Sequence, residues 1–306
     1  MQGSDRVQTM GLQRFFYAAE NGRRISYVLR NPASTKEATF CFLHATGFHA
    51  LVWLEVIANL PPTAGVLALD AAGHGCSDVP NDHASWQQVA HDAQLVMQRI
   101  QWQHAVVIGH SMGGAAAMML AAQYPDSVSR LVLLDPTIFP DGLRLVMRTW
   151  YACTGKHFSD FVKKRKNRYV GVQDMIDRFQ QKPVFALWHD HVLADYCNYG
   201  LLQATETSDY ALRCSPPIEA AYYRSGMFVY PGDWSAMQQP ITLVYAMRSS
   251  SWFFSGFQYS PTDPRLAQRV QAPINVVHAD DLTHFIPMQA PERTAAWIKD
   301  ALEVSD

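Results

Sequence analysis

Short apolar runs alternate with helix-like stretches along most of the chain. Four of the runs are continuous and apolar, as is typical of strands buried on both faces of a parallel sheet: Thr39–Leu43, Gly65–Leu69, Ala105–Ile108 and Leu131–Leu134. The stretches between them that have the character of helices are Trp53–Leu60, Ser85–Ile100 and Met112–Gln123. Because strand–helix–strand units form right-handed crossovers, the alternation predicts an α/β fold with a doubly wound, mostly parallel sheet.

A hairpin signal precedes these runs. Leu12–Ala18 and Arg24–Arg30 are short strand-like segments, and Asn21-Gly22 lies between them. Asn and Gly both tolerate the positive φ that tight hairpin turns require. We therefore expect two strands joined by a turn before the parallel strands begin.

The alternation stops after Pro136 and resumes at Ile241–Ala246. Residues 138–237 in between are rich in aromatic side chains, from Trp150 to Phe228, and have helical spacing without a buried-strand signal. We predict that this segment is a helical cap domain, inserted between two strands and lying over the ends of the sheet.

The rest of the core follows the inserted segment. Ile274–Val277 is another apolar strand run, and a final helix is expected at about Pro291–Leu302. The α/β core domain is therefore expected to comprise two pieces of the chain, residues 1–137 and 238–306. A chain of 306 residues is long enough to bury roughly three quarters of its unfolded surface in such a fold.

Composition and charge exclude several kinds of function. With 25 basic and 27 acidic residues the formal net charge is −2, so no excess of basic residues would attract nucleic acid. No run approaches the ~20 apolar residues of a membrane span, and Met1–Met10 lacks the apolar core of a secretory signal. The five cysteines include no C-x-x-C pair, which favours free thiols over a zinc site or disulfides. We expect a cytoplasmic protein without cofactor or metal, and the sequence leaves its oligomeric state open.

The strongest chemical signal is the motif Gly109-His110-Ser111-Met112-Gly113, between a buried strand run and a helix of small residues. A G-x-S-x-G motif in this context is typical of a nucleophile elbow. The turn is so tight that the neighbours of the serine must lack bulk, and the helix N-terminus behind it favours developing negative charge. Ser111 is therefore the candidate nucleophile.

His284 is the candidate base. It lies on a loop after the last strand run and before the final helix, and a loop there can bring an imidazole over the sheet edge to the serine. A serine hydroxyl is a poor nucleophile until such a base takes its proton. The two residues together predict nucleophilic catalysis.

The chain resembles α/β-hydrolase-fold proteins across nearly its whole length. Four segments carry the resemblance: 42–50 (FLHATGFHA), 69–78 (LDAAGHGCSD), 108–117 (IGHSMGGAAA) and 279–287 (ADDLTHFIP). In this family the serine comes early in the chain and the histidine last, as Ser111 and His284 do. A serine at the elbow separates the chain from the epoxide-hydrolase and dehalogenase branches, which have aspartate there. The resemblance implies a serine esterase-like hydrolase without specifying its substrate.

An oxyanion hole is also implied by the resemblance. The loop His44-Ala45-Thr46-Gly47 resembles the His-Gly-x-Gly loop of the family, with alanine in place of the first glycine. By analogy, the donors are the backbone N–H groups of Met112, the residue after the nucleophile, and of Thr46.

The acid is assigned by comparison with the places where the family carries it. Most relatives have it after the strand that follows the cap, but here that position reads Met247-Arg248-Ser249-Ser250-Ser251, without a carboxylate. A minority have it one strand earlier, where Asp135 directly follows Leu131–Leu134. We predict that Asp135 orients His284 and stabilises its charged form, and the alternatives are Asp280, Asp281 and Asp263.

These residues predict hydrolysis of carboxylic esters or lactones through an acyl-enzyme on Ser111. The expected partner is a small ester-like molecule with an apolar part, which aromatic residues of the cap would contact. Because one fold serves many reactions, the alternatives are a C–C bond hydrolase or an aminopeptidase of the same fold, and a ligand receptor that turns over slowly.

Overall fold

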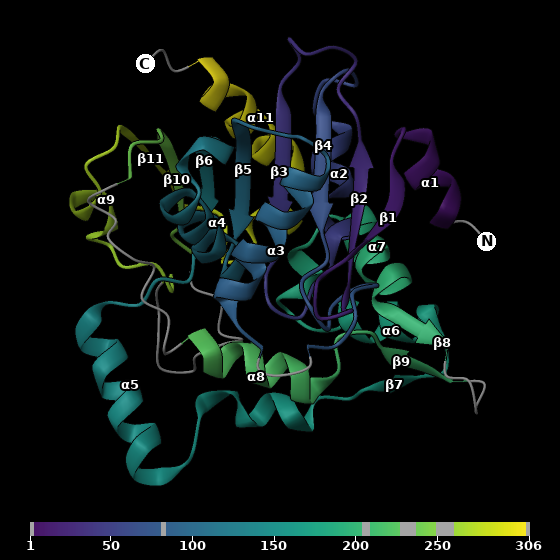
Figure 1. The fold of residues 1–306 in the computed structure, drawn as a ribbon. Helices are drawn as coiled ribbons and strands as arrows, with labels where there is room; N and C mark the ends of the chain where they lie inside the picture. The colour runs from purple at the N-terminus through teal and green to yellow at the C-terminus, as the bar shows by residue number, and fades with distance from the viewer. Residues whose placement is uncertain (1–2, 81–83, 204–208, 227–236, 249–259, 304–306) are drawn as a thin grey trace.

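The computed structural model describes residues 3–80, 84–203, 209–226, 237–248 and 260–303. Its centre is an eight-stranded sheet in the order β1-β2-β4-β3-β5-β6-β10-β11 (Figure 1). The first two strands pair antiparallel with each other, and β2 pairs antiparallel with β4, whereas every pair from β4 to β11 is parallel. The prediction of a doubly wound, mostly parallel sheet is confirmed.

The strands of this sheet coincide closely with the apolar runs of the sequence. Their bounds are β1 Gln13–Ala18, β2 Arg24–Arg30, β3 Thr39–Leu43, β4 Gly65–Leu69, β5 Ala105–His110, β6 Val128–Leu134, β10 Ile241–Ala246 and β11 Ile274–Ala279. The expected hairpin is formed by β1 and β2, and Gly22 at its turn has φ +78°.

Helices cover both faces of the sheet. The helices α3 (Trp86–Arg99) and α4 (Met112–Gln123) pack on one face, and α2 (Leu54–Ala58) and α11 (Pro291–Glu303) pack on the other. Alternate side chains of a strand point to opposite faces, so Phe40 and Phe42 of β3 pack with α2 and α11, whereas Cys41 and Leu43 pack with α3 and α4. Shorter helices complete this part: α1 Gly3–Thr9, η1 Ala50–Trp53, η2 Pro125–Ser127, α9 Leu266–Arg269 and α10 Ile286–Gln289.

One predicted helix has different bounds in the structure. The sequence predicts a single helix over Trp53–Leu60, but the helical stretch begins earlier, as the 3₁₀ helix η1, and ends as the short α2. Every residue from Ala50 to Ile57 is buried, so burial is not confined to one face and periodicity cannot locate the ends of the helix.

Residues 138–237 connect β6 to β10. Their described elements are α5 Asp141–Thr154, η3 Phe158–Lys164, β7 Arg168–Tyr169, α6 Val172–Gln180, η4 Phe185–Leu187, α7 Asp190–Gly200, β8 Leu201–Gln203, β9 Tyr210–Leu212 and α8 Pro216–Gly226. Figure 1 shows these elements gathered beyond the carboxyl ends of the parallel strands. The division into a core domain and a cap domain stays a prediction, and Phe228 lies outside the described residues.

The inserted segment is not entirely helical. Its strands β7, β9 and β8 form a separate antiparallel sheet in that order. Each strand has only two or three residues, which is too short for a recognisable alternation in the sequence. Among the described residues, no helix combines the length and the apolar character needed to cross a membrane.

Candidate active site

Ser111 lies at a sharp turn between β5 and α4. Its backbone has φ 56° and ψ −117°, a conformation that residues other than glycine rarely adopt and that is frequent at functional sites. A Cβ on Gly113 would lie 2.1 Å from the carbonyl oxygen of Leu43, and one on Gly109 would lie 2.3 Å from the carbonyl oxygen of Gly113. The motif therefore needs glycine at both positions because backbone passes directly beside them.

His284 lies between Ser111 and Asp135. Its Nε2 is 3.0 Å from the Ser111 Oγ, and its Nδ1 is 2.6 Å from the Asp135 Oδ2. The three residues come from the ends of β5 and β6 and from the loop after β11, which meet at one edge of the sheet. A carboxylate at Nδ1 places the imidazole proton there and leaves Nε2 as an acceptor for the serine hydroxyl.

The Asp135 carboxylate is completely buried and bonded through both oxygens. Its Oδ1 accepts hydrogen bonds from the Ala246 N–H at 3.2 Å, from the Thr262 hydroxyl at 3.3 Å and from the Ser260 hydroxyl. Its backbone has φ 43°. Since Oδ1 is occupied by these donors, Oδ2 is directed to His284.

The other candidate acids have different partners. Asp263 pairs with Arg269 at 3.2 Å, and Asp281 pairs with Arg293 at 2.6 Å. The position after β10 holds Met247 and Arg248, both exposed, and residues 249–251 lie outside the described part of the chain.

The two oxyanion candidates are neighbours. The Thr46 hydroxyl lies 3.3 Å from the Met112 Sδ, and both residues are buried. Met112 is the first residue of α4, and the first N–H groups of a helix have no partner within it. Gly47, next to Thr46, donates its N–H to the His74 Nε2 at 3.0 Å, which fixes the loop.

A family model described as alpha/beta hydrolase fold matches residues 38–306. The chain belongs to the α/β-hydrolase family. Over 264 residues it is 29% identical to Lipase LipV of Mycobacterium tuberculosis, covering 85% of this chain and 91% of that protein. Other similarities are shorter, such as 44% identity over 70 residues with the mouse sn-1-specific diacylglycerol lipase ABHD11, which covers 23% of this chain and 22% of that protein.

Solved structures share the fold of this hydrolase. The structure of E-2-(acetamidomethylene)succinate hydrolase matches with a TM-score of 0.73 and 17% identity, covering 96% of this chain and all of the other. The structure of the esterase Rv0045c from Mycobacterium tuberculosis matches with a TM-score of 0.66 and 21% identity, covering 98% of this chain and 96% of that one. At these identities the likeness concerns the fold alone.

Thr137 is a site residue of this hydrolase that the sequence motifs did not include. Its hydroxyl lies 3.0 Å from the Ser111 Oγ, and its N–H donates to the Ser111 carbonyl at 3.0 Å. It follows Asp135-Pro136 directly, so the available signal was a hydroxyl residue two positions after a candidate acid.

His110 entered the sequence motif only as a neighbour of the serine, yet it contacts the loop of the candidate base. Its Nε2–H donates to the His284 carbonyl at 2.7 Å. Burial, followed by the nearby His284, holds the pKa of His110 well below the usual histidine range. The ring is therefore neutral at pH 7 and ties the His284 loop to the elbow without adding charge.

Aromatic rings connect the α/β-hydrolase core to the inserted segment beside this site. Phe48 follows the oxyanion loop and stacks on Trp188 at 5.6 Å between ring centroids, and Trp188 lies 5.4 Å from Phe285. Phe285 is itself 5.6 Å from the His284 ring. Phe185 and Tyr196 of the inserted segment join the same cluster. Through Phe285 this cluster of rings, which comes from both parts of the chain, reaches the imidazole.

Proposed function

We propose that this α/β hydrolase cleaves carboxylic esters or lactones through an acyl-enzyme on Ser111. The observation that supports it is the continuous series of contacts from the Ser111 Oγ through the His284 imidazole to the Asp135 Oδ2, at 3.0 and 2.6 Å. Similarity to a lipase over 91% of its length favours an ester over the other bonds that the fold can cleave.

In the proposed reaction, the Ser111 Oγ attacks the substrate carbonyl while the His284 Nε2 takes the hydroxyl proton. Asp135 stabilises the resulting imidazolium, and the backbone N–H groups of Met112 and Thr46 stabilise the oxyanion. His284 then gives the proton to the leaving alcohol. Water, deprotonated by the same imidazole, releases the acid from Ser111 and restores the enzyme.

The proposed substrate is a small molecule with an apolar acyl or alcohol part. The aromatic rings beside His284 support this, because apolar walls around a few polar groups are typical of small-molecule sites. Residues 138–237 would act as the cap, since Phe185, Trp188 and Tyr196 of that segment contribute rings to the cluster.

The test is labelling with a fluorophosphonate, followed by hydrolysis of aryl esters of increasing acyl length. Ser111→Ala should remove the label and lower kcat by up to ~10⁶, the size of triad losses in other serine hydrolases. Ser85→Ala, on the loop before α3, is the matched control and should keep both the label and the kcat of the wild type. Full ester hydrolysis by a folded Ser111→Ala protein would overturn the proposal.

The same experiment separates the alternatives. A slow ligand receptor would release about one equivalent of aryl alcohol and then stall, whereas a hydrolase continues to turn over. An aminopeptidase would hydrolyse an aminoacyl anilide faster than the matched ester. A C–C bond hydrolase would leave both aryl esters and anilides largely intact.

A further inference from the structure

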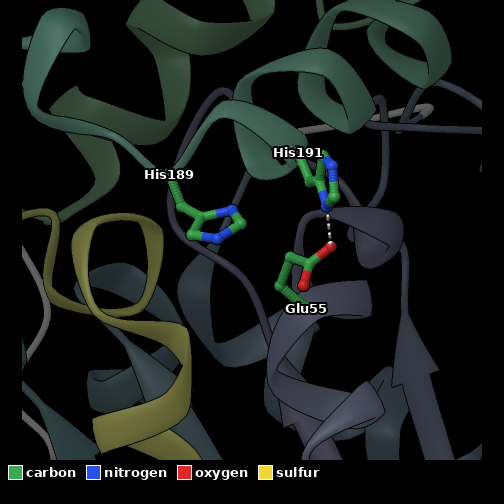
Figure 2. Close-up of side chains that lie close together, drawn as sticks. All are labelled: Glu55, His189 and His191. Carbon is green, nitrogen blue, oxygen red and sulfur yellow. Dashed lines mark hydrogen bonds and ion pairs between the residues drawn. The ribbon is translucent and has the colours of Figure 1, made fainter.

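The contact between α2 and α7 brings Glu55, His189 and His191 together. One carboxylate oxygen and one nitrogen from each imidazole all lie within 4.8 Å of one another. Figure 2 shows both rings directed toward Glu55, and the His191 Nδ1 lies 3.0 Å from the Glu55 Oε1. No step of the proposed hydrolysis uses these three residues.

The positions of the three side chains are set by the packing of α2 against α7. Glu55 lies in α2 and is buried with only 8% of its surface exposed, His189 is the N-cap residue of α7, and His191 belongs to its first turn. The His189 Nδ1 is buried and has no hydrogen-bond partner among the described residues. A buried imidazole nitrogen without a partner is costly, so a ligand that bonds it would stabilise this arrangement.

The charge around the cluster favours a cation. Glu55 and Asp195 are both buried and share one counter-charge, the guanidinium of Arg6, which pairs with each of them. The Glu292 Oε1 lies 3.8 Å from the His189 Nε2 and adds a further negative charge. Among the described residues, the ion pairs here join three carboxylates to one guanidinium, which leaves an excess of negative charge where the two imidazoles meet.

We propose that Glu55, His189 and His191 bind a divalent transition-metal ion, of which Zn²⁺ suits the donors best. Zn²⁺ prefers imidazole nitrogen and carboxylate oxygen, with bonds of about 2.0–2.2 Å, and accepts three protein ligands plus water. The ion takes the place of the hydrogen between the His191 Nδ1 and Glu55, and neutral His191 carries its proton on Nε2. Arg6 keeps its pair with Asp195.

The side-chain movement that this requires is small. Ligand atoms of a tetrahedral zinc site lie about 3.3 Å apart, as its bond lengths dictate, and the three atoms here are within 4.8 Å. The His191 side chain is 69% exposed, so its ring can adjust without disturbing the core. Bound metal would join α2 of the sheet layer to α7 of the inserted segment.

The sequence led us to expect no metal, because ligands of a metal site are recognised at short spacings along the chain. His189 and His191 are two residues apart, but Glu55 lies far upstream in another helix. Only the contact between α2 and α7 brings the third ligand to the pair.

The test is a zinc titration of the whole purified chain, followed by calorimetry and by competition with a chromophoric chelator. We expect one equivalent to bind to the wild type. Loss of a ligand in His189→Ala or in His191→Ala should weaken binding on the order of tenfold or more. His91→Ala is the matched control, since His91 is exposed and bonded to the Tyr124 hydroxyl, and it should bind as the wild type does.

A second readout is independent of catalysis. Zinc should raise the thermal unfolding midpoint of the wild type and of His91→Ala by more than that of His191→Ala, because a ligand of the native state stabilises it in proportion to how tightly it binds. Unchanged affinity in both histidine variants would overturn the proposal. So would binding that disappears only in His284→Ala, because the metal would then lie at the proposed catalytic site.

Discussion

The hydroxyl of Ser111 has two partners, and their chemistry fixes the direction of its proton. Asp135 keeps the His284 proton on Nδ1, so Nε2 accepts from Ser111. The Ser111 Oγ is then left to accept a hydrogen bond from the Thr137 hydroxyl at 3.0 Å. In the proposed reaction Thr137 is therefore a positioning residue, which holds the oxygen at the distance from which it would attack.

Replacing Thr137 tests this role. Thr137→Val keeps the shape of the side chain and removes one hydrogen bond, worth about 0.5–1.5 kcal/mol, so kcat should fall by roughly 2–10-fold. Thr137→Ser keeps the hydroxyl and should restore most of the rate. The measurement is kcat on an aryl ester under saturating conditions. The positioning role would be contradicted if Thr137→Val had the kcat of the wild type. It would also be contradicted if Thr137→Ser lost as much kcat as Thr137→Val.

The identity of the acid gives a second prediction for a single residue. Asp135→Asn should lower kcat by about 10⁴, because an amide stabilises the wrong histidine tautomer and cannot stabilise an imidazolium. Asp281→Asn is the control: Asp281 is on the same loop as His284 but pairs with Arg293 on the surface, and its loss should leave kcat unchanged. The measurement is kcat of both variants on one ester. A large loss in Asp281→Asn with normal activity in Asp135→Asn would identify Asp281 as the acid instead.

The sequence could single out Ser111 and His284 as candidates but not every residue that contacts them. A serine between two glycines after an apolar strand is a local pattern, and so is a histidine between the last strand and helix. Asp135 needed the sheet order in addition, because its proposed role depends on β6 lying beside β5. Ser260 and Thr262 contact Asp135 from more than a hundred residues away along the chain, and no local pattern marks such contacts.

At the scale of elements, the tight approach of α4 to β3 gives the elbow its rigidity. A Cβ added at Gly113 would lie 2.1 Å from the carbonyl oxygen of Leu43 and 2.8 Å from that of His44. Both are backbone atoms, which cannot turn away as a side chain can. The helix can lie this close to the strand only if residue 113 has no side chain.

Gly113→Ala should therefore lower the free energy of unfolding by about 1–3 kcal/mol, the usual cost of overpacking a core. Gly142→Ala is the matched control, because no atom lies within 4 Å of the added Cβ, and alanine is favoured in helices by up to about 1 kcal/mol. Urea unfolding measures both. A Gly113→Ala protein as stable as the wild type would show that the strand and the helix can separate at little cost.

The length of a strand decided whether the sequence could predict it. The central strands β3, β4 and β5 are runs of buried, mostly apolar residues because both of their faces are covered, and the sequence therefore shows them clearly. The strand β7 consists of Arg168 and Tyr169 alone, the first exposed and the second buried. A single alternation carries no periodic signal, so the small sheet of the inserted segment depends on tertiary contacts.

At the scale of the whole molecule, five histidines are buried among the described residues, and four of them, His44, His49, His74 and His110, must stay neutral for the fold around the site to persist. His44 accepts a hydrogen bond from the Ala71 N–H and His74 accepts one from the Gly47 N–H, each through Nε2 at 3.0 Å. A protonated imidazole has no acceptor, so protonation would break both bonds and loosen the loop with the oxyanion candidates. His49 and His110 are buried as completely.

Burial is the largest cause of the lowered pKa of each of these histidines, to about 4 for His49 and about 3 for His74. In the unfolded chain their pKa is about 6.5. Below pH 6.5 the unfolded state therefore binds more protons than the native state, and stability falls as the pH falls toward the native pKa. Burial also raises the pKa of Asp195 to about 6, which works in the opposite direction between pH 6 and 4, but one carboxyl opposes four imidazoles.

The urea midpoint should therefore be nearly constant above pH 7 and fall steeply between pH 6.5 and 4.5. Each neutral histidine contributes up to about 1.4 kcal/mol per pH unit in that window. His74→Gln removes one titrating ring and should lower stability at pH 7.5 while reducing the steepness of the fall. His91→Gln, at an exposed position, should leave the curve unchanged. Equal midpoints at pH 7.5 and 5 in the wild type would mean that these histidines are protonated in the native state, and the bonds from Ala71 and Gly47 could not exist as described.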